Sequence, residues 1–148
     1  MSLEERIQQG LKAAMLAKDT DRLATLRLLK SAVGYLQIER KFEHLSDIEV
    51  IAVIQKEIKK RRDAIEQYQA GARPELAEKE AREMAVLESF LPQPLAPEEL
   101  EQLVRATIQE LGAASKKDMG AVIKAVQGKA AGRADGKNIS ALTGKLLT

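Results

Sequence analysis

The stretch Leu91 to Leu100 reads LPQPLAPEEL and decides how the chain is divided. It holds prolines at positions 92, 94 and 97, three within six residues. Proline lacks a backbone N–H and clashes with the preceding helical turn, so no helix continues through such a cluster. The stretch therefore predicts a boundary between an N-terminal domain, residues 1–91, and a C-terminal domain, residues 92–148, with residues 92–97 as a proline-rich linker.

On the N-terminal side of the linker, helix signals recur and strand signals are absent. Ser2 with Glu5 makes a capping box, and Ser46–Glu49 repeats the pattern. Asp19 can cap a second helix, and Pro74 suits the first turn of a fourth. Apolar residues recur every three or four positions after each start, which predicts a body of four helices. The expected core stripes include Leu3, Ile7, Leu11 and Met15 in the first helix, and Leu76, Met84, Leu87 and Leu91 in the fourth.

On the C-terminal side, the same signals predict three shorter helices. Pro97 opens the first, and Gly112 ends it. Ser115 caps the second, which we expect to end at Gly128. Asp135 can cap the third. The sequence thus predicts an all-α fold, in which an N-terminal four-helix body is followed by a small three-helix tail domain.

The composition excludes several classes of site. The chain of 148 residues has no cysteine and one histidine, His44, so thiol chemistry and a histidine metal cluster are excluded. We expect no catalytic residue, metal or cofactor. No apolar run approaches the ~18 residues of a membrane span. Glu4 and Glu5 precede any apolar stretch, which does not resemble a signal peptide, so we expect a cytoplasmic protein without membrane contact.

Charge is distributed unevenly along the chain. Residues 1–91 carry 16 cations and 16 acids, whereas residues 112–148 carry seven cations and two acids, a net charge of +5. A basic end after a balanced body is typical of a protein with a polyanionic partner. The alternative is a solvated surface that is basic without a partner.

The stretch QGKAAGRADGKNIS, residues 127–140, concentrates glycines and cations. Part of it, AGRADGK, is spaced like a nucleotide-binding phosphate loop, but Asn138 follows in place of Ser or Thr and no strand precedes it. A glycine-rich loop that leads into a helix N-terminus exposes backbone N–H groups near the positive end of the helix dipole. Turn formation explains the glycines, but the cations favour a phosphate-binding loop.

The helix before this loop adds two lysines and a glycine. Lys117 and Lys124 lie opposite the apolar face of the helix, with Gly120 between them. A glycine inside a helix costs about 1 kcal/mol relative to alanine. Either a partner that approaches closely or a tight contact with a neighbouring helix explains Gly120. The predicted nucleic-acid-binding residues are Lys117, Gly120, Lys124, Gly128, Lys129, Gly132, Arg133, Gly136 and Lys137.

One cation of the N-terminal domain does not fit a solvated helix face. Arg61 falls within the apolar stripe that contains Ile54, Ile58 and Ile65. It is either a snorkelling or paired arginine at a helix contact, or part of an anion site.

The chain resembles the YqeY family, also called GatB/YqeY-like proteins, over nearly its whole length. The matching segments are LRLLKSA, EIKKRRDAIEQY, LESFLPQPL, KKDMGAVIKAV and GRADGK. The tail is also similar to the C-terminal domain of GatB, a subunit of the glutamine-dependent aminoacyl-tRNA amidotransferase. Met119-Gly120 and Gly128-Lys129-Ala130 stand where that domain has its own Met-Gly and Gly-Lys-Ala.

The resemblance implies a tRNA-binding accessory module, since the tail domain of GatB contacts tRNA while other domains carry out amide transfer. It would also group the chain with carbon-nitrogen ligases that use glutamine as amide donor, although we expect no stand-alone activity. The implied partners are tRNA and an amidotransferase or an aminoacyl-tRNA synthetase. A protein-interaction adaptor that binds one of these enzymes is the alternative.

Overall fold

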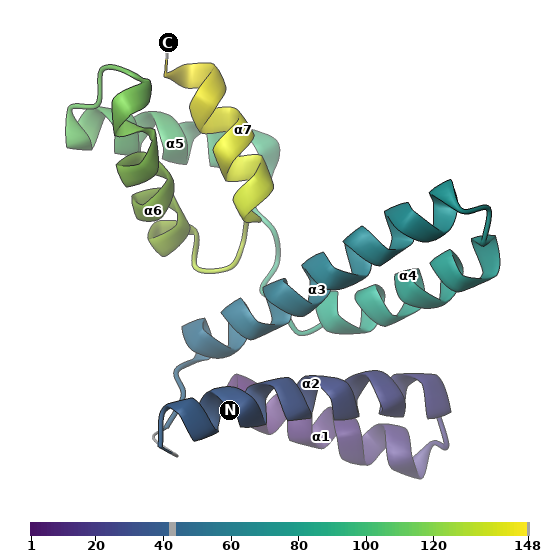
Figure 1. Ribbon diagram of the computed structural model, residues 1–148. Coiled ribbons are helices and arrows are strands. Elements are labelled where there is room, and N and C mark those ends of the chain that lie inside the picture. The colour runs from purple at the N-terminus through teal and green to yellow at the C-terminus, as the bar shows by residue number, and fades with distance from the viewer. Residues whose placement is uncertain (42–43, 148) are drawn as a thin grey trace. The chain divides into compact units, whose positions relative to one another are not determined.

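The computed structural model describes residues 1–41 and 44–147, and in this part of the chain every regular element is a helix (Figure 1). The α-helices are α1 (Leu3–Leu16), α2 (Thr20–Glu39), α3 (Asp47–Ala70), α4 (Pro74–Glu88), α5 (Pro97–Leu111), α6 (Met119–Ala130) and α7 (Gly136–Leu146). A single 3₁₀ turn, η1 (Lys116–Asp118), precedes α6. The predicted all-α fold is confirmed.

The chain divides into two compact units, each with its own hydrophobic core. Unit 1 is Met1–Leu91 and unit 2 is Pro92–Thr148. The fully buried large side chains of unit 1 include Leu26, Leu29, Ile54 and Leu87. Those of unit 2 include Val104, Val122, Val126 and Ile139. Each unit thus has buried residues of its own and is described by itself.

Unit 1 is built from two helical hairpins. In Figure 1, α1 lies antiparallel to α2, and α3 lies antiparallel to α4. Phe90, two residues after the end of α4, packs against α1. A Cβ atom at Gly10 would lie 3.1 Å from Phe90 Cζ. Gly10 therefore provides the space for this ring. The guanidinium groups of Arg6 and Arg22 lie 5.7 and 6.0 Å from the ring centroid, within cation–π range.

The predicted helix starts are confirmed at Ser2, Asp19, Ser46, Pro74, Pro97 and Asp135, but Ser115 caps the 3₁₀ turn η1, and α6 itself begins at Met119. At Ser2 the capping box is complete: the Glu5 N–H donates to Ser2 Oγ over 3.2 Å, and the Ser2 N–H donates to Glu5 Oε2. Ser46 Oγ accepts from the Glu49 N–H over 3.3 Å. Asp19 accepts from the third residue of α2 in the same way. These side chains satisfy N–H groups that have no partner inside the helix.

Two predicted core positions are wrong by one residue. Met15 is 52% exposed, and the neighbouring Ala14 is buried in its place. Leu76 is 37% exposed, and Ala77 is buried. In both helices a small alanine faces the closely packed partner helix, and the larger neighbour turns toward solvent. The sequence pattern assigns the larger residue of each pair to the core, whereas close packing of two helices places the smaller residue at the contact.

The end predicted for the second helix of the tail is also wrong. Gly128 lies inside α6, which continues to Ala130. Ala130 is only 2% exposed, so its burial in the unit 2 core extends the helix by half a turn. The left-handed residues that end it are Ala131, with φ 48°, and Gly132, with φ 83°. Gly112, with φ 64°, ends α5 as predicted.

Candidate nucleic-acid interface

The solvent-facing side of α6 presents glycines and lysines. Gly120, Lys124 and Gly128 are exposed along it, and Lys117 is exposed in η1 directly before it, while Val122 is fully buried on the opposite side. A Cβ atom placed at Gly120 or Gly128 would meet nothing within 4 Å. The described residues therefore provide no tight helix contact that would require either glycine. We call these four residues the α6 face.

Lys129 lies away from the α6 face and toward α5. Its Nζ donates to the Glu110 carboxylate and, over 3.3 Å, to the hydroxyl of Thr107. Thr107 is fully buried, and its own hydroxyl donates to the Leu103 carbonyl over 2.7 Å. This lysine links the end of α6 to α5, so its charge is already partly balanced within the unit.

Arg133 joins the loop between α6 and α7 to the linker. Its Nε donates to the Gln93 carbonyl over 2.9 Å, and its own carbonyl accepts from the Leu95 N–H over 2.8 Å. Arg133 therefore holds two loops of unit 2 together. Its half-buried position agrees with this structural role.

Lys129 and Arg133 line one hollow of about 440 Å³. The other residues that line it are Leu95, Glu99, Gln102, Leu103 and Ala130. The Glu99 side chain accepts from the Ala96 N–H over 3.2 Å, which keeps a carboxylate at the hollow. The structure therefore separates the predicted cations into those of the α6 face, those of this hollow, and Lys137 in the first turn of α7.

The N-terminus of α7 already has an anion. Asp135 Oδ1 accepts from the Asn138 N–H over 2.7 Å. Gly136 follows it, and a Cβ atom there would lie 3.3 Å from Gln127 Nε2. Because a carboxylate occupies the positive end of the helix, the exposed side chain of Lys137 is better placed than the backbone to meet a phosphate.

Sequence reasoning missed the partners of Lys129 and Arg133. Glu110 is 19 residues from Lys129, and Gln93 is 40 residues from Arg133. No local spacing rule connects positions so far apart. A basic residue near a glycine-rich loop gives the same sequence signal whether it is paired within the fold or open to solvent.

Arg61 in unit 1 is a buried, paired arginine, which confirms that interpretation. The residue is 8% exposed, and its guanidinium lies 3.6 Å from Glu57 Oε2 and 3.5 Å from Glu83 Oε2. It also donates to the Glu57 carbonyl over 3.2 Å. Burial raises the pKa of the adjacent Glu80, the Glu83 carboxylate raises it further, and Arg61 opposes both effects.

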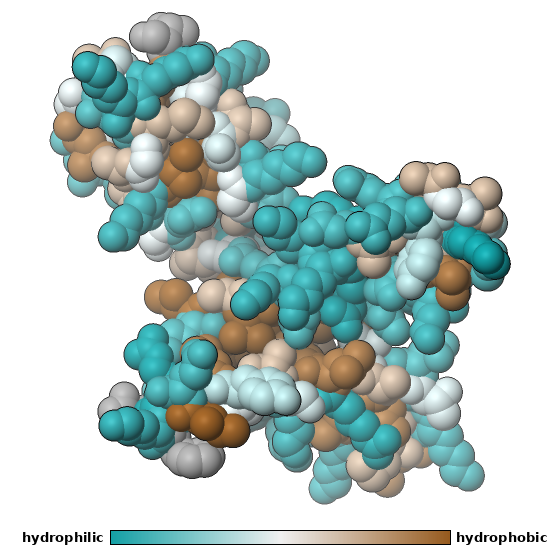
Figure 2. Space-filling model, viewed as in Figure 1, coloured by the Kyte–Doolittle hydropathy of each residue, from teal (hydrophilic) through white to brown (hydrophobic). Residues whose placement is uncertain are grey.

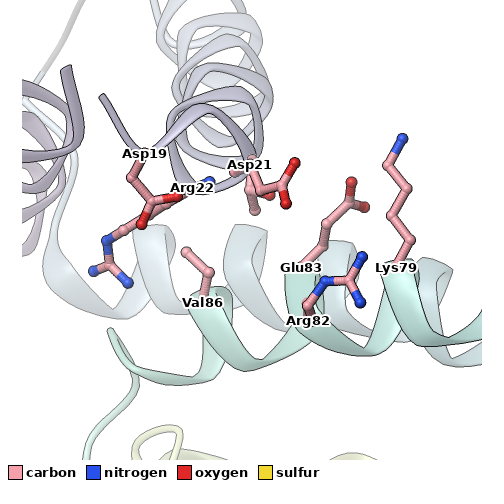
Figure 3. Close-up of a pocket in the computed structure, with 8 residues that line it drawn as sticks. Asp19, Asp21, Arg22, Lys79, Arg82, Glu83 and Val86 are labelled. Atoms are coloured by element: carbon pink, nitrogen blue, oxygen red, sulfur yellow. Dashed lines mark hydrogen bonds between the residues drawn. The ribbon is translucent and has the colours of Figure 1, made fainter. Parts of the chain in front are cut away.

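Glu83 also borders a hollow of about 220 Å³ between the start of α2 and α4 (Figure 3). Acids and bases alternate around it: the lining residues are Asp19, Asp21, Arg22, Thr25, Lys79, Arg82, Glu83 and Val86. Asp19 is used in capping α2, and Arg22 lies at the Phe90 ring. This mixture of charges favours neither an anionic nor a cationic ligand.

Residues 1–41 and 44–147 contain neither a membrane-spanning helix nor a metal-binding cluster. No helix among them has the length and apolarity needed to cross a bilayer. They contain no group of three or more His, Asp or Glu residues placed to hold a metal ion. His44 is exposed in the connection that precedes α3.

The family of Yqey-like proteins matches residues 4–147, which is almost the entire chain. The chain belongs to this family. It shares 37% identity over 84 residues with the Kluyveromyces lactis protein named altered inheritance of mitochondria protein 41, mitochondrial. That match covers 57% of this chain and 45% of the relative, so this Yqey-like chain spans less than half of that protein.

Two further relatives extend the comparison. A Schizosaccharomyces pombe protein without an assigned role is 35% identical over 92 residues, covering 62% of this chain and 74% of the relative. The Vanderwaltozyma polyspora protein with the same mitochondrial name is 30% identical over 107 residues, covering 71% of this chain and 58% of the relative.

The prediction of a cytoplasmic protein is wrong, because the relatives that carry a location in their names are named as mitochondrial. That prediction rested on the residues at the start of the chain and on the lack of a long apolar run. Neither feature distinguishes one cellular compartment from another.

Proposed function

We propose that this Yqey-like chain is a tRNA-binding accessory module without catalytic chemistry of its own, and that unit 2 makes the RNA contact. The observation that carries the proposal is the α6 face, where Lys117 and Lys124 project beside two glycines that leave the helix surface open. Because glycine has no side chain, a helix face made of glycines and lysines lets the protein backbone approach a chain of phosphates closely.

The charge distribution supports the same partner. Residues 112–148 carry a net charge of +5, and two of their cations are engaged by Glu110 and by the Gln93 carbonyl. Of the five cations predicted to bind nucleic acid, Lys117, Lys124 and Lys137 are therefore assigned the phosphate contacts, while Lys129 and Arg133 hold parts of unit 2 together. The similarity of the tail to the tRNA-contacting domain of GatB favours tRNA over other polyanions.

The test is the salt dependence of binding to unfractionated tRNA, measured by fluorescence anisotropy. Each phosphate contact contributes roughly 0.7–0.9 to the slope of log affinity against log salt concentration. Changing Lys117, Lys124 and Lys137 together to alanine should reduce that slope by about two units. Binding should weaken for all tRNA sequences alike, because phosphate contacts carry no base information.

The matched control replaces three exposed lysines of unit 1, Lys12, Lys56 and Lys59, with alanine. It removes the same formal charge and should leave the slope almost unchanged. An equal loss in both triple variants would show that only net charge matters. If the native chain does not bind tRNA at low salt, the adaptor that binds an amidotransferase or a synthetase becomes the better proposal.

We expect no amide transfer by the isolated chain supplied with glutamine, ATP and misacylated tRNA. The chain has no cysteine to act as a nucleophile, and it has one histidine that could act as a base. Turnover by protein freed of contaminating amidotransferase would overturn this part of the proposal.

A further inference from the structure

Helix α2 exposes a row of large apolar side chains on the side that faces away from the unit 1 core. Leu28 is 55% exposed, Tyr35 73% and Ile38 60%. With 3.6 residues per turn, these three fall with Ala24 and Ser31 in a sector of roughly 80°. We call these five residues the α2 outer face. None of them is charged.

The same helix already buries its opposite side, where Leu26 and Leu29 are 0% and 1% exposed. A surface helix of a globular protein normally has one apolar stripe, and a second one marks a contact with another molecule. Figure 2 shows hydrophobic surface along the α1–α2 layer of unit 1, beside the more hydrophilic surface of α3 and α4.

The edges of the α2 outer face carry opposite charges. Asp21 and Glu39 are 18 residues apart, which is five helical turns, so they share one edge. Arg27 lies along the other edge, and Lys30 lies about 60° further round the helix on the same side. All four side chains are exposed. Such a surface is complementary to an amphipathic helix with an apolar strip of its own. The acidic edge of that helix would meet the basic edge of α2, and its basic edge would meet the acidic edge of α2.

A second copy of this chain fits the α2 outer face less well. In an antiparallel two-fold pairing about Ser31, like edges of the two helices face each other, which brings Glu39 beside the second copy's Asp21. If the two copies pair in parallel, no acidic residue of the second copy lies level with Arg27 along the helix axis. The charges therefore favour a different partner over self-association.

We propose that the α2 outer face binds an amphipathic α-helix of another protein, with acidic residues along the edge that meets Arg27 and Lys30, and basic residues along the edge that meets Asp21 and Glu39. The partner's apolar side chains recur at three- and four-residue spacing and pack between Leu28, Tyr35 and Ile38. This surface is on unit 1, and it is independent of the RNA contact proposed for unit 2.

The probe is a synthetic 21-residue peptide with a leucine seam, glutamates along one edge and lysines along the other, labelled for fluorescence anisotropy with the full chain. We expect saturable binding that Leu28→Ser with Ile38→Ser weakens at least tenfold. Arg27→Glu with Lys30→Glu should weaken it by a similar factor. The matched control, Lys56→Glu with Lys59→Glu, should leave it unchanged. Circular dichroism of each variant verifies that the helices remain folded.

Three results would overturn the proposal. One is the absence of saturable binding to the native chain, and another is binding that the substitutions of the α2 outer face leave unaltered. The third is a concentration-dependent dimer in sedimentation that Leu28→Ser with Ile38→Ser dissolves, which would assign this face to a second copy. Loss of tRNA binding in the α6 variants bears on none of these results.

Discussion

Both units place a cation between helices, but at different depths. In unit 1 the Arg61 side chain is 10% exposed and lies between two carboxylates whose side chains are 14% and 16% exposed. In unit 2 the Lys129 side chain is 38% exposed, and its partner Glu110 is 64% exposed. Water screens the second pair and not the first. Formal charge is the same in both cases, so the surroundings of a cation decide how strongly its ion pair stabilises the fold.

The largest expected effect is the loss of Arg61. Arg61→Ala leaves Glu57 and Glu83 facing each other, half-buried and without their counter-ion, which should lower the free energy of unfolding of unit 1 by about 3–5 kcal/mol. Urea denaturation followed by circular dichroism measures it. Lys59→Ala, at an exposed position of the same helix, should change stability by no more than about 0.5 kcal/mol. Equal effects would mean that the arginine pairs contribute nothing.

The next effect concerns the cap of α7. Asp135→Ala removes the acceptor of the Asn138 N–H and should lower the stability of unit 2 by about 1 kcal/mol. Asp135→Asn keeps a capping oxygen, so it should cost only a few tenths of a kcal/mol. Thermal unfolding of both variants separates the hydrogen bond from the charge. If Asp135→Asn lowered the stability of unit 2 as much as Asp135→Ala does, the result would contradict the capping account.

The smallest effect is the pH dependence set by Glu80. Its pKa is raised above the ordinary value of 4.5, so the folded chain holds this proton more tightly than the unfolded chain does. The ionised form is the less stable one in the fold, and stability contributed by Glu80 therefore falls as pH rises above 4.5. Glu80→Gln should be more stable than the native chain at pH 7, but by no more than about 0.5 kcal/mol, because solvent screens this partly exposed carboxyl. Below the ordinary carboxyl pKa this advantage should disappear, and an advantage that persists at pH 3 would point to packing.

Local sequence signals predicted the helix starts well because a cap is formed by residues three positions apart. Ser2 with Glu5, Ser46 with Glu49, and Asp135 with Asn138 all adopt the expected hydrogen bonds. The prolines at 74 and 97 open α4 and α5 for an equally local reason, the fixed φ angle of proline.

Core register and the pairing of Lys129 and Arg133 could not be predicted, because both depend on contacts across the fold. Whether Ala14 or Met15 faces the core is decided by how closely α1 approaches its neighbours. In the same way, the burial of Ala130 carries α6 past Gly128. The candidate site shows the same limit, since the sequence marks Lys124 and Lys129 as equivalent until Glu110 and Thr107 are placed beside one of them.

The most direct test of the difference between these cations is the salt dependence of tRNA binding by two double variants. One is Lys117→Ala with Lys124→Ala on the α6 face, and the other is Lys129→Ala with Arg133→Ala at the hollow. Each removes two positive charges from unit 2. The first should reduce the slope of log affinity against log salt concentration by roughly 1.4–1.8, and the second should leave that slope nearly unchanged. A reduction confined to the Lys129 and Arg133 variant would contradict the assignment of the RNA contact to the α6 face.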